Sequence, residues 1–584
     1  MPPHFGYSKA VHIAPIDGLR ALAVIAVIFY HLGFTWIPGG FLGVDVFFVI
    51  SGYVITRLLL DSILSANGLD VRKFYMARIR RLLPGLLLMS IITSVAIALF
   101  APDAIHRFIQ DLPFVLTGTN NWHLVALHQD YFQAVGRPPL LQHTWSLAVE
   151  SQFYLIWPLI LYFVWRRFGQ RSVRRAAVII ALISGTALLL FSISADRAGT
   201  GRISHVYFGT DTHSIGLFLG DALAVSWIPR NLSADVTQRA KDFIDLIGVL
   251  GLIGIILTFL FITESNATLY RIAFPIAGLF SCMMIISIVH PASRFSKIFS
   301  FYPLLWIGQR SYGIYLWHWI IFQVTRPGID LAGKPWALDA ARILLVLFFA
   351  DFSLRYVEEP FRTGTVQNWF RGMRYRVPEI KRKQRALIGA SLVIVLAVTS
   401  SSVALALYRN SRLVIIPKED ISLQQTIISP TNEGIWLTGD SVILGIKTKL
   451  AAQEPISLVN AKVGRQIDDL IKAVKLDGPK VPHSKIVLDV GNNNIITRDQ
   501  MVELMELIKN QPKIVIVNTA VPRVWKDKNN EIIASVVSNY PNVKLIDWNS
   551  LSKGHPEFFA PDGVHLIENG SDVYVAAILE ALNN

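Results

Sequence analysis

A serine between two apolar runs is the first candidate for chemistry in this chain, in the segment "WLTGDSVILG" (436–445). The first run has the character of a buried strand, and the second continues as a helix-like stretch. Ser441 would then lie beside the backbone N–H groups of a helix N-terminus, where the helix dipole stabilises negative charge. This placement suits the nucleophile of a hydrolase or an acyl-transfer enzyme. The alternative is a structural role, because Asp and Ser after a strand commonly cap a helix.

A carboxylate and a histidine near the C-terminus can complete a catalytic triad. Asp562 and His565 in "PDGVHL" are three residues apart, so their side chains can approach one another across a single turn. His565 would act as the base on Ser441, and Asp562 would orient the imidazole. Taken alone, an Asp-x-x-His pair is more often a surface feature. The prediction therefore depends on further blocks in the same region.

Two further segments offer hydrogen-bond donors for an oxyanion. Gly464 in "KVGRQ" has no side chain, so its N–H can approach the site, and Asn493 in "DVGNNN" offers an amide at the end of a predicted strand. With the N–H of Ser441 they would surround a developing negative charge.

These four blocks resemble the SGNH (GDSL-like) hydrolase family over nearly all of residues 430–584. The resemblance implies Ser441 as nucleophile, with Asp562 and His565 completing the triad. It also implies an oxyanion hole formed by Ser441, Gly464 and Asn493. The segments "AKVGRQ", "NTAVPRVW" and "DGVHL" are similar to the version found in peptidoglycan O-acetyltransferases. One departure is Asn494 in "GNNN", where those relatives usually have Gly.

The region around these blocks has the pattern of a separate α/β domain. Short β-branched runs at 434–439, 484–491, 512–520 and 543–548 alternate with helical stretches. This alternation predicts βαβ units and a largely parallel sheet that is covered on both faces. A segment of about 150 residues is long enough to bury its own core.

The preceding sequence has the composition of a polytopic membrane protein. The chain is 52% hydrophobic and 16% charged, and its mean hydropathy is +0.45. Eleven apolar segments approach the ~20 residues that cross a bilayer as a helix. They lie at about 19–36, 41–60, 82–101, 146–166, 176–194, 211–228, 243–263, 270–290, 300–323, 335–356 and 386–408.

Basic residues concentrate in alternate loops between these segments. One set of loops holds 25 Lys and Arg residues, and the other set holds 7. Because cytoplasmic loops are enriched in Lys and Arg, this asymmetry predicts a cytoplasmic N-terminus and an extracytoplasmic C-terminal domain. Because the asymmetry accounts for the net charge of +14, this charge does not indicate nucleic-acid binding. The single cysteine, Cys282, argues against a disulfide framework and against a cysteine metal site.

Two ionisable residues share one face of the first predicted span. Arg20 and His31 are eleven residues apart, which places them about 20° apart around a helix and ~16 Å apart along it. Ionisable side chains inside a span are costly and usually functional. For Arg20 the alternative is a side chain that reaches the cytoplasmic headgroups.

The surrounding motifs resemble the acyltransferase family three membrane module over roughly residues 12–365. They are "IDGLRALAVIAVIFYH", "GGFLGVDVFFVISGYVIT", "HTWSLAVE", "SYGIYLWHW" and "VEEPFR". The resemblance implies that an acyl group from cytoplasmic acyl-CoA is delivered outward, with His31 as catalytic base or acyl relay and Arg20 binding the donor. Weaker candidates fall in motif positions: Asp45, Ser51, His143, Glu150, Tyr315 and His318. Ser151 stands where relatives usually have a second Glu, so the carry-over in that motif ends at Glu150.

Three further arginines are candidates for binding the acyl donor. Arg78, Arg80 and Arg81 can pair with the phosphates of CoA, because a guanidinium matches phosphate geometry. The alternative is the ordinary enrichment of basic residues in cytoplasmic loops. The candidate donor-binding set is thus Arg20, Arg78, Arg80, Arg81, Asp45 and Glu150.

The sequence therefore predicts a polytopic α-helical membrane domain at 1–365 and a soluble SGNH-like α/β domain with a parallel sheet at 433–584. Between them, 366–432 would hold a cytoplasmic basic loop, a linking transmembrane helix (386–408) and an extracytoplasmic linker.

Together the two resemblances imply an O-acetyltransferase of the bacterial cell (inner) membrane. It would move acetyl groups from cytoplasmic acetyl-CoA to hydroxyls of an extracytoplasmic glycan through an acyl-Ser441 intermediate. Peptidoglycan muramic acid is the favoured acceptor, and O-antigen of lipopolysaccharide or another exopolysaccharide is the alternative. A surface glycan esterase and a glycolipid transporter are the rival functions. We expect no bound cofactor and no metal site.

Overall fold

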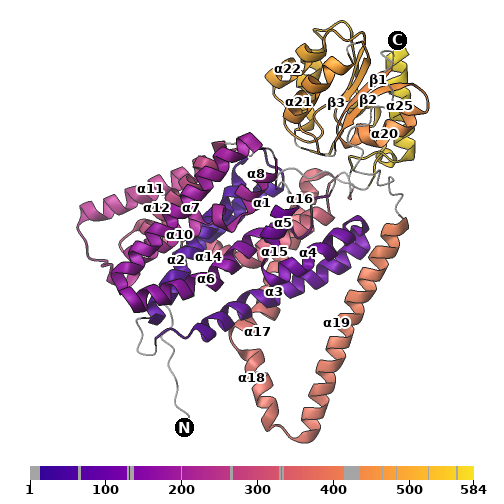
Figure 1. Ribbon diagram of the computed structural model, residues 1–584. Helices are drawn as coiled ribbons and strands as arrows, with labels where there is room; N and C mark the ends of the chain where they lie inside the picture. The colour runs from indigo at the N-terminus through magenta and orange to yellow at the C-terminus, as the bar shows by residue number, and fades with distance from the viewer. Residues whose placement is uncertain are drawn as a thin grey trace. The chain divides into compact units, whose positions relative to one another are not determined.

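The computed structural model (Figure 1) describes residues 13–63, 68–127, 131, 137–198, 200–263, 268–327, 330–331, 334–412, 434–462, 464–481, 483–523, 525–560 and 563–583. Contacts divide the chain into two compact units. The first consists of Met1–Tyr131, Pro139–Val324 and Pro335–Leu405, and the second of Phe132–Pro138, Thr325–Lys334 and Ala406–Asn584.

The first unit is helical. Its long helices are α1 Ala14–His31, α2 Gly43–Ile63, α3 Val71–Phe100, α6 Trp145–Phe168, α7 Gln170–Ala198, α11 Gln238–Phe261, α12 Thr268–Val289 and α16 Pro335–Ser353. Helix α19 Pro378–Arg412 begins in the first unit and ends in the second. The shorter helices are α4 Ile105–Thr117, α5 Asn120–Ala126, α8 Thr200–Phe208, α9 Thr210–His213, α10 Ile215–Ser226, α13 Arg294–Ile298, α14 Tyr302–Gln309, α15 Ser311–Val324, α17 Glu359–Arg362 and α18 Thr365–Gly372.

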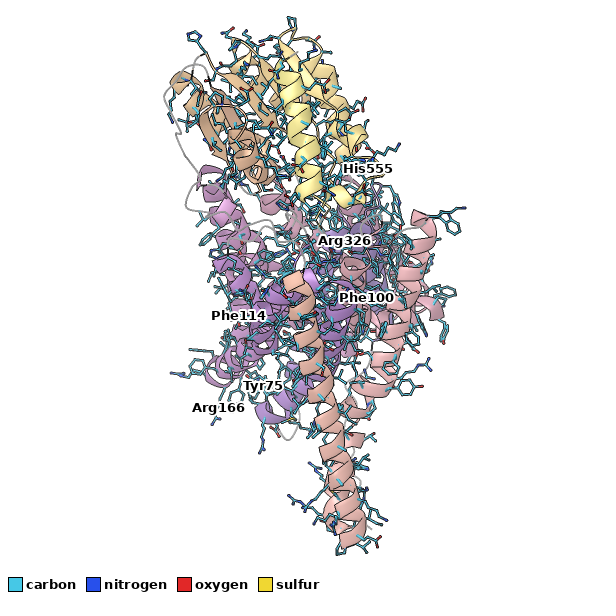
Figure 2. All side chains as sticks on the ribbon, turned by 90° about the vertical axis from the view of Figure 1, so that its right-hand side faces the viewer. Tyr75, Phe100, Phe114, Arg166, Arg326 and His555 are labelled. Carbon is cyan, nitrogen blue, oxygen red and sulfur yellow. The ribbon has the colours of Figure 1, made fainter. Side chains whose placement is uncertain are left out.

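Among the described residues, eight helices are long and apolar enough to cross a membrane, and each overlaps one of the predicted spans. Large apolar side chains such as Phe100 and Phe114 are exposed on the helical unit (Figure 2). In the most apolar 18-residue stretch of α19, only 6% of the residues are buried. Exposed apolar surface of this extent fits helices that lipid surrounds.

Three predicted spans have a different form. The segment predicted at 211–228 is divided between α9 and α10, and the segment at 300–323 is divided between α14 and α15. At the second division, Arg310 donates through Nε to Asp351 of α16 over 2.7 Å. Asp351, together with Asp339 and Arg342, gives α16 more charge than a simple span carries. The number of spans therefore stays a prediction.

Helices α2 and α10 pack with their backbones in direct contact. A Cβ added at Gly52 would lie 1.9 Å from the carbonyl oxygen of Leu217, and one added at Gly220 would lie 2.2 Å from that of Val49. Small residues at helix contacts permit such close approach in membrane proteins.

The second unit contains a five-stranded parallel sheet in the order β2-β1-β3-β4-β5. Its strands are β1 Ile435–Gly439, β2 Ile456–Ala461, β3 Lys485–Asp489, β4 Ile514–Val517 and β5 Val543–Ile546. The sheet and four of its strands confirm the predicted fold class, whereas β2 was not predicted. Its helices are α20 Ser441–Ala451, α21 Ile467–Asp477, α22 Arg498–Ile508, α23 Lys526–Val537, α24 Trp548–Leu551 and α25 Glu568–Asn583.

Helices cover both faces of this sheet, as predicted (Figure 1). Leu437 packs into a core with residues of α20 and α25. Its neighbour Trp436 faces the opposite core, which is formed with α21, α22 and α23. Strands β1 and β3 are in register, with Thr438 opposite Leu488. The residues that follow these two strands therefore meet at the carboxyl edge of the sheet.

Candidate functional site

Ser441 begins α20 directly after β1, as the sequence predicts. Asp440 caps this helix, because its Oδ1 accepts a hydrogen bond from the N–H of Val442 over 2.8 Å. Ser441 is only 5% exposed, and its Oγ has no hydrogen-bond partner among the residues that the structure describes. The helix N-terminus thus presents an uncommitted hydroxyl where negative charge is stabilised.

His565 lies in a loop whose backbone is fixed by the residues around it. Its carbonyl oxygen accepts a hydrogen bond from the N–H of Ala560 over 2.7 Å, and Leu566 forms an antiparallel bridge with Phe559. The side chain is half-buried between the buried Val564 and Leu566. Asp562 lies outside the described residues, so the triad of Ser441, His565 and Asp562 stays a prediction.

The predicted oxyanion donors differ in how their hydrogens are used. Gly464 has φ +71°, a left-handed conformation that favours glycine. Asn493 donates through Nδ2 to Asp440 Oδ2 over 2.6 Å and to the carbonyl oxygen of Arg465 over 3.3 Å. Both amide hydrogens of Asn493 thus have acceptors. Donation to an oxyanion would require the longer of these bonds to be released.

The sequence analysis did not identify Asp489, whose carboxyl group is hydrogen-bonded to Asp440, the residue before Ser441. Asp489 ends β3 and is 3% exposed. Its Oδ1 accepts a hydrogen bond from the N–H of Asp440 over 2.9 Å, and its Oδ2 accepts one from Asn492 over 3.1 Å. Burial and the adjacent Asp440 raise the pKa of Asp489 well above its ordinary value. A carboxylate at the end of a buried strand was the available sequence signal.

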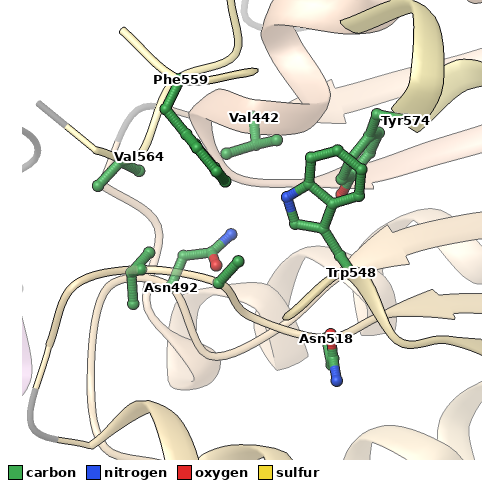
Figure 3. Close-up of a pocket in the computed structure, with 9 residues that line it drawn as sticks. Val442, Asn492, Asn518, Trp548, Phe559, Val564 and Tyr574 are labelled. Atoms are coloured by element: carbon green, nitrogen blue, oxygen red, sulfur yellow. The ribbon is translucent and has the colours of Figure 1, made fainter. Parts of the chain in front are cut away.

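A small pocket is lined by residues that neighbour these site residues along the chain (Figure 3). Val442, Asn492 and Val564 line it, and they are the immediate neighbours of Ser441, Asn493 and His565. The remaining lining residues are Asn518, Ala520, Val521, Trp548, Phe559 and Tyr574.

In the helical unit, His31 belongs to a chain of hydrogen bonds. Its Nε2 lies 2.9 Å from the hydroxyl of Tyr131, and its Nδ1 lies 3.2 Å from Nε2 of His318. Nδ1 of His318 lies 2.7 Å from the carbonyl oxygen of Tyr315. The structure therefore brings His31 and the weaker candidate His318 together and adds Tyr131, which sequence reasoning missed.

The direction of this chain follows from its last acceptor. A carbonyl oxygen accepts only, so Nδ1 of His318 carries a hydrogen and, in the neutral ring, Nε2 accepts from Nδ1 of His31. Nε2 of His31 then accepts from the hydroxyl of Tyr131. This is the arrangement of a general base beside a hydroxyl nucleophile.

His143 and Tyr315 surround the same site. The rings of His143 and His318 have centroids 5.9 Å apart. The hydroxyl of Tyr315 donates to the carbonyl oxygen of His143 over 2.7 Å and lies 2.7 Å from Oγ of Ser146. The motif residues of the short 3-10 helix η3 (Gln142–Thr144), α6 and α15 are thus assembled around His31.

Three of the candidate donor-binding arginines converge elsewhere in the helical unit. Arg20 interacts electrostatically with Arg81 and Glu150, and Arg78 interacts with the same two residues and with Arg20. Glu150 accepts a hydrogen bond from Ser51. Arg20 also pairs with Asp17 over 3.5 Å. The three guanidinium groups gathered in one place still offer paired donors to an anionic ligand.

Two other candidates lie apart from the centre of this cluster. Arg80 is two residues from Arg78, so it projects from a different side of α3. Asp45 instead pairs with His213 over 3.1 Å, and both side chains are buried. Nδ1 of His213 lies 2.5 Å from the carbonyl oxygen of Tyr207, which fixes the ring.

One face of α6 connects the arginine cluster with the His31 site. Ser146, Glu150 and Tyr154 are spaced by four residues and so lie along one side of the helix. Ser146 contacts Tyr315, and Tyr154 interacts electrostatically with Arg81 and Arg78. Polar side chains therefore lie at intervals along α6 between the two sites.

The chain is similar to a known protein family and to individual O-acetyltransferases. The family described as "Acyltransferase domain" matches residues 13–353. Peptidoglycan O-acetyltransferase OatA of Listeria monocytogenes is 34% identical over 99% of both chains. O-acetyltransferase OatA of Staphylococcus aureus is 32% identical over 98% of this chain and 96% of its own length.

Several solved structures are similar to part of the chain, and one example comes from Streptococcus pneumoniae. It is the C-terminal catalytic domain of peptidoglycan O-acetyltransferase A from Streptococcus pneumoniae with a methylsulfonyl adduct, which is 25% identical and covers 26% of this chain and 93% of that chain, with a TM-score of 0.23. The family match spans more than half of the chain, and the relatives align with both of its parts. The chain therefore belongs to the acyltransferase family, and over 98–99% of its length it is similar to O-acetyltransferases.

Proposed function

We propose that this protein transfers acetyl groups to hydroxyls of an extracytoplasmic glycan and that peptidoglycan muramic acid is the acceptor. The observation that carries the proposal is Ser441, a buried serine at a helix N-terminus. It lies in a chain that aligns over 99% of its length with a peptidoglycan O-acetyltransferase. O-antigen or another exported polysaccharide is the alternative acceptor.

Acetyl-CoA is the proposed donor, bound from the cytoplasm. The cluster of Arg20, Arg78 and Arg81 would hold its phosphates, and Arg80 would extend this surface on another side of α3. Arginine suits this role because its donors fit phosphate oxygens in pairs. The 25 basic residues in alternate loops favour the same cytoplasmic side.

The first transfer would use the hydroxyl of Tyr131. His31 takes the phenolic proton while the oxygen attacks the thioester carbonyl, the C–S bond breaks, and the proton passes to the leaving thiolate. The hydrogen bond from Tyr131 to Nε2 of His31 supports this step. His318 keeps the imidazole in the required tautomer.

The second transfer would use Ser441. His565 takes its proton, the serine oxygen accepts the acetyl group, and the proton passes to the departing oxygen of the first carrier. A sugar hydroxyl then attacks the acetyl-serine, which forms the product ester and restores Ser441. Asp562 would orient His565, and the N–H groups of Ser441 and Gly464, with the amide of Asn493, would stabilise the oxyanion.

The proposed division of labour follows the predicted boundaries. Residues 1–365 would form the acyltransferase membrane domain, 433–584 the SGNH-like catalytic domain, and 366–432 the connection through the helix at 386–408. The N-terminus would be cytoplasmic and the SGNH domain extracytoplasmic, in the bacterial inner membrane. The family match to residues 13–353 supports the first of these boundaries.

Separate Ser441→Ala and His31→Ala variants of the full chain test the proposal in a strain that lacks its own enzyme. We expect each to lose ester-linked acetate in peptidoglycan, because each removes one step of the transfer. Ser538→Ala and His106→Ala remove an exposed serine and an exposed histidine, so they serve as matched controls.

Three results would overturn parts of the proposal. Normal acetylation with Ser441→Ala would remove the acyl-serine step, and normal acetylation with His31→Ala would remove the base. Acetate that depends on this protein in another surface glycan, but not in peptidoglycan, would replace the acceptor.

A further inference from the structure

The nucleophile turn and the loop after β3 are joined through two buried carboxyl groups. Asp440 and Asp489 are 4% and 3% exposed, and the backbone N–H of Asp440 donates to Oδ1 of Asp489 over 2.9 Å. The side chains of the two aspartates also interact with each other. Two charged carboxylates held together in a buried site would repel each other, so one proton on the pair is favoured.

Each of the two carboxyl groups accepts two hydrogen bonds, but only Asp440 caps α20, where the helix dipole favours negative charge. Oδ1 of Asp440 accepts from the N–H of Val442 at the start of α20, and its Oδ2 accepts from Asn493 over 2.6 Å. Hydrogen bonds from a helix N-terminus and an amide favour a carboxylate. The proton of the pair therefore belongs on Asp489, whose pKa burial and Asp440 raise well above the ordinary value.

Among the residues that the structure describes in this domain, two other titratable groups interact with Asp489, and neither replaces Asp440 as its partner. Arg465 is the adjacent cation, but its guanidinium donates to both the carbonyl oxygen and Oδ1 of Asn460. Tyr574 of α25 also interacts with the pair, and burial together with the two aspartates raises its pKa well above the ordinary value. It stays a neutral phenol in any neutral solution.

We propose that Asp489 is a positioning residue of the Ser441 site and works in its acid form. Its proton bridges to Asp440, and Asp440 in turn fixes the first turn of α20 and the amide of Asn493. The inference rests on the proposed role of Ser441 as acyl carrier. Asp489 itself touches neither the acetyl group nor the attacking hydroxyl.

Loss of this proton has a defined consequence. Two carboxylates in one buried site repel each other, so Asp440 would shift, and both the cap on Val442 and the contact with Asn493 would loosen. Acyl transfer at Ser441 should therefore decline as the pH rises through the raised pKa of Asp489. Displacement of a reacting group by about 1 Å can cost about 100-fold in rate.

Ester hydrolysis by the full-length protein in detergent tests the inference, with 4-nitrophenyl acetate as the probe because it bypasses the membrane steps. Asp489→Asn keeps a donor toward Asp440 and an acceptor for its N–H, so we expect near-normal kcat without the alkaline decline. Asp489→Leu has similar size without either group, so we expect a loss of about 100-fold in kcat with little change in KM. Asp499→Asn, on the exposed start of α22, is the control with an unchanged pH profile.

Thermal stability gives a second readout that does not depend on activity. A folded-state pKa above the unfolded value stabilises the protein at low pH, and this contribution is lost as the pH rises through the folded value. Asp489→Asn lacks this dependence. Its melting temperature relative to the unsubstituted protein should therefore increase with pH.

The outcomes separate this inference from the proposed function. Normal hydrolysis by Ser441→Ala would refute the nucleophile itself. If Ser441→Ala is inactive but Asp489→Asn keeps the alkaline decline, or folded Asp489→Leu is fully active, the role of Asp489 is wrong. If Asp489→Leu does not fold, the pH profile and stability of Asp489→Asn still decide.

Discussion

The carbonyl oxygen of Tyr315 can only accept a hydrogen bond, and this single property sets the proton positions along His318, His31 and Tyr131. Replacing Tyr131 by Phe removes the hydroxyl at the end of the chain and leaves the ring. We expect Tyr131→Phe to abolish acetylation of the glycan while the protein accumulates normally in the membrane. Ester-linked acetate and protein amount would be measured in the same cells.

Tyr53→Phe is the matched control for this change. Its hydroxyl is also in the helical unit and donates to the carbonyl oxygen of Trp227 over 3.0 Å, away from His31. Loss of one such hydrogen bond costs about 1 kcal/mol, so acetylation should persist. Normal acetylation in Tyr131→Phe would show that another hydroxyl receives the acetyl group.

Sequence patterns identified functional residues only where neighbours along the chain share one element. Ser441 follows from a strand, a turn and a helix in succession, and His31 follows from its spacing to Arg20 on α1. Tyr131 is 100 residues from its partner His31, and Asp489 is 49 residues from Asp440. Tyr131 has no local pattern that marks it, and the position of Asp489 at the end of a buried strand does not identify Asp440 as its partner, because the fold creates both contacts.

Polar residues inside apolar segments explain why the sequence pattern missed one strand and one helix boundary. Strand β2 is entirely buried, yet it contains Ser457 and Asn460, which interrupt its apolar run. Asn460 is satisfied by Arg465 and by Asp477, both outside the strand. The division between α14 and α15 likewise depends on Arg310, whose charge is paired with Asp351 on another helix.

The contact between α2 and α10 gives a prediction for one pair of helices. Gly52→Ala and Gly220→Ala would each place a methyl group about 2 Å from a backbone oxygen, so the helices must separate. We expect each to lower the yield of folded protein after detergent extraction, at a cost of about 1–3 kcal/mol. Size-exclusion chromatography of a fluorescent fusion measures this yield.

Gly389→Ala in α19 is the control for these two substitutions. A Cβ there meets nothing within 4 Å, and alanine is the better helix former. Its yield should match or exceed that of the unsubstituted protein. Equal yields for all three variants would mean that α2 and α10 tolerate a wider separation.

For the whole molecule, composition alone separated a membrane part from a soluble part, because a bilayer and water select opposite side chains. The parallel sheet confirms the α/β fold predicted for the C-terminal part, and the family match is consistent with an acyltransferase domain in the N-terminal part. Orientation is harder to derive, since a single miscounted span reverses the side of everything that follows. The two divided segments and the charged α16 are the places where the count can fail.

Two engineered cysteines on either side of α19 test the orientation directly. Replacing Cys282 by Ser removes the native thiol, because the chain has one cysteine. Tyr375→Cys and Leu476→Cys then place single thiols at positions that are 90% and 71% exposed. In intact cells, a membrane-impermeant maleimide should label only Leu476→Cys, and Tyr375→Cys should react after permeabilisation. The reverse result would put the SGNH domain in the cytoplasm and remove its access to surface glycan, and labelling of both from one side would show that α19 does not cross the membrane.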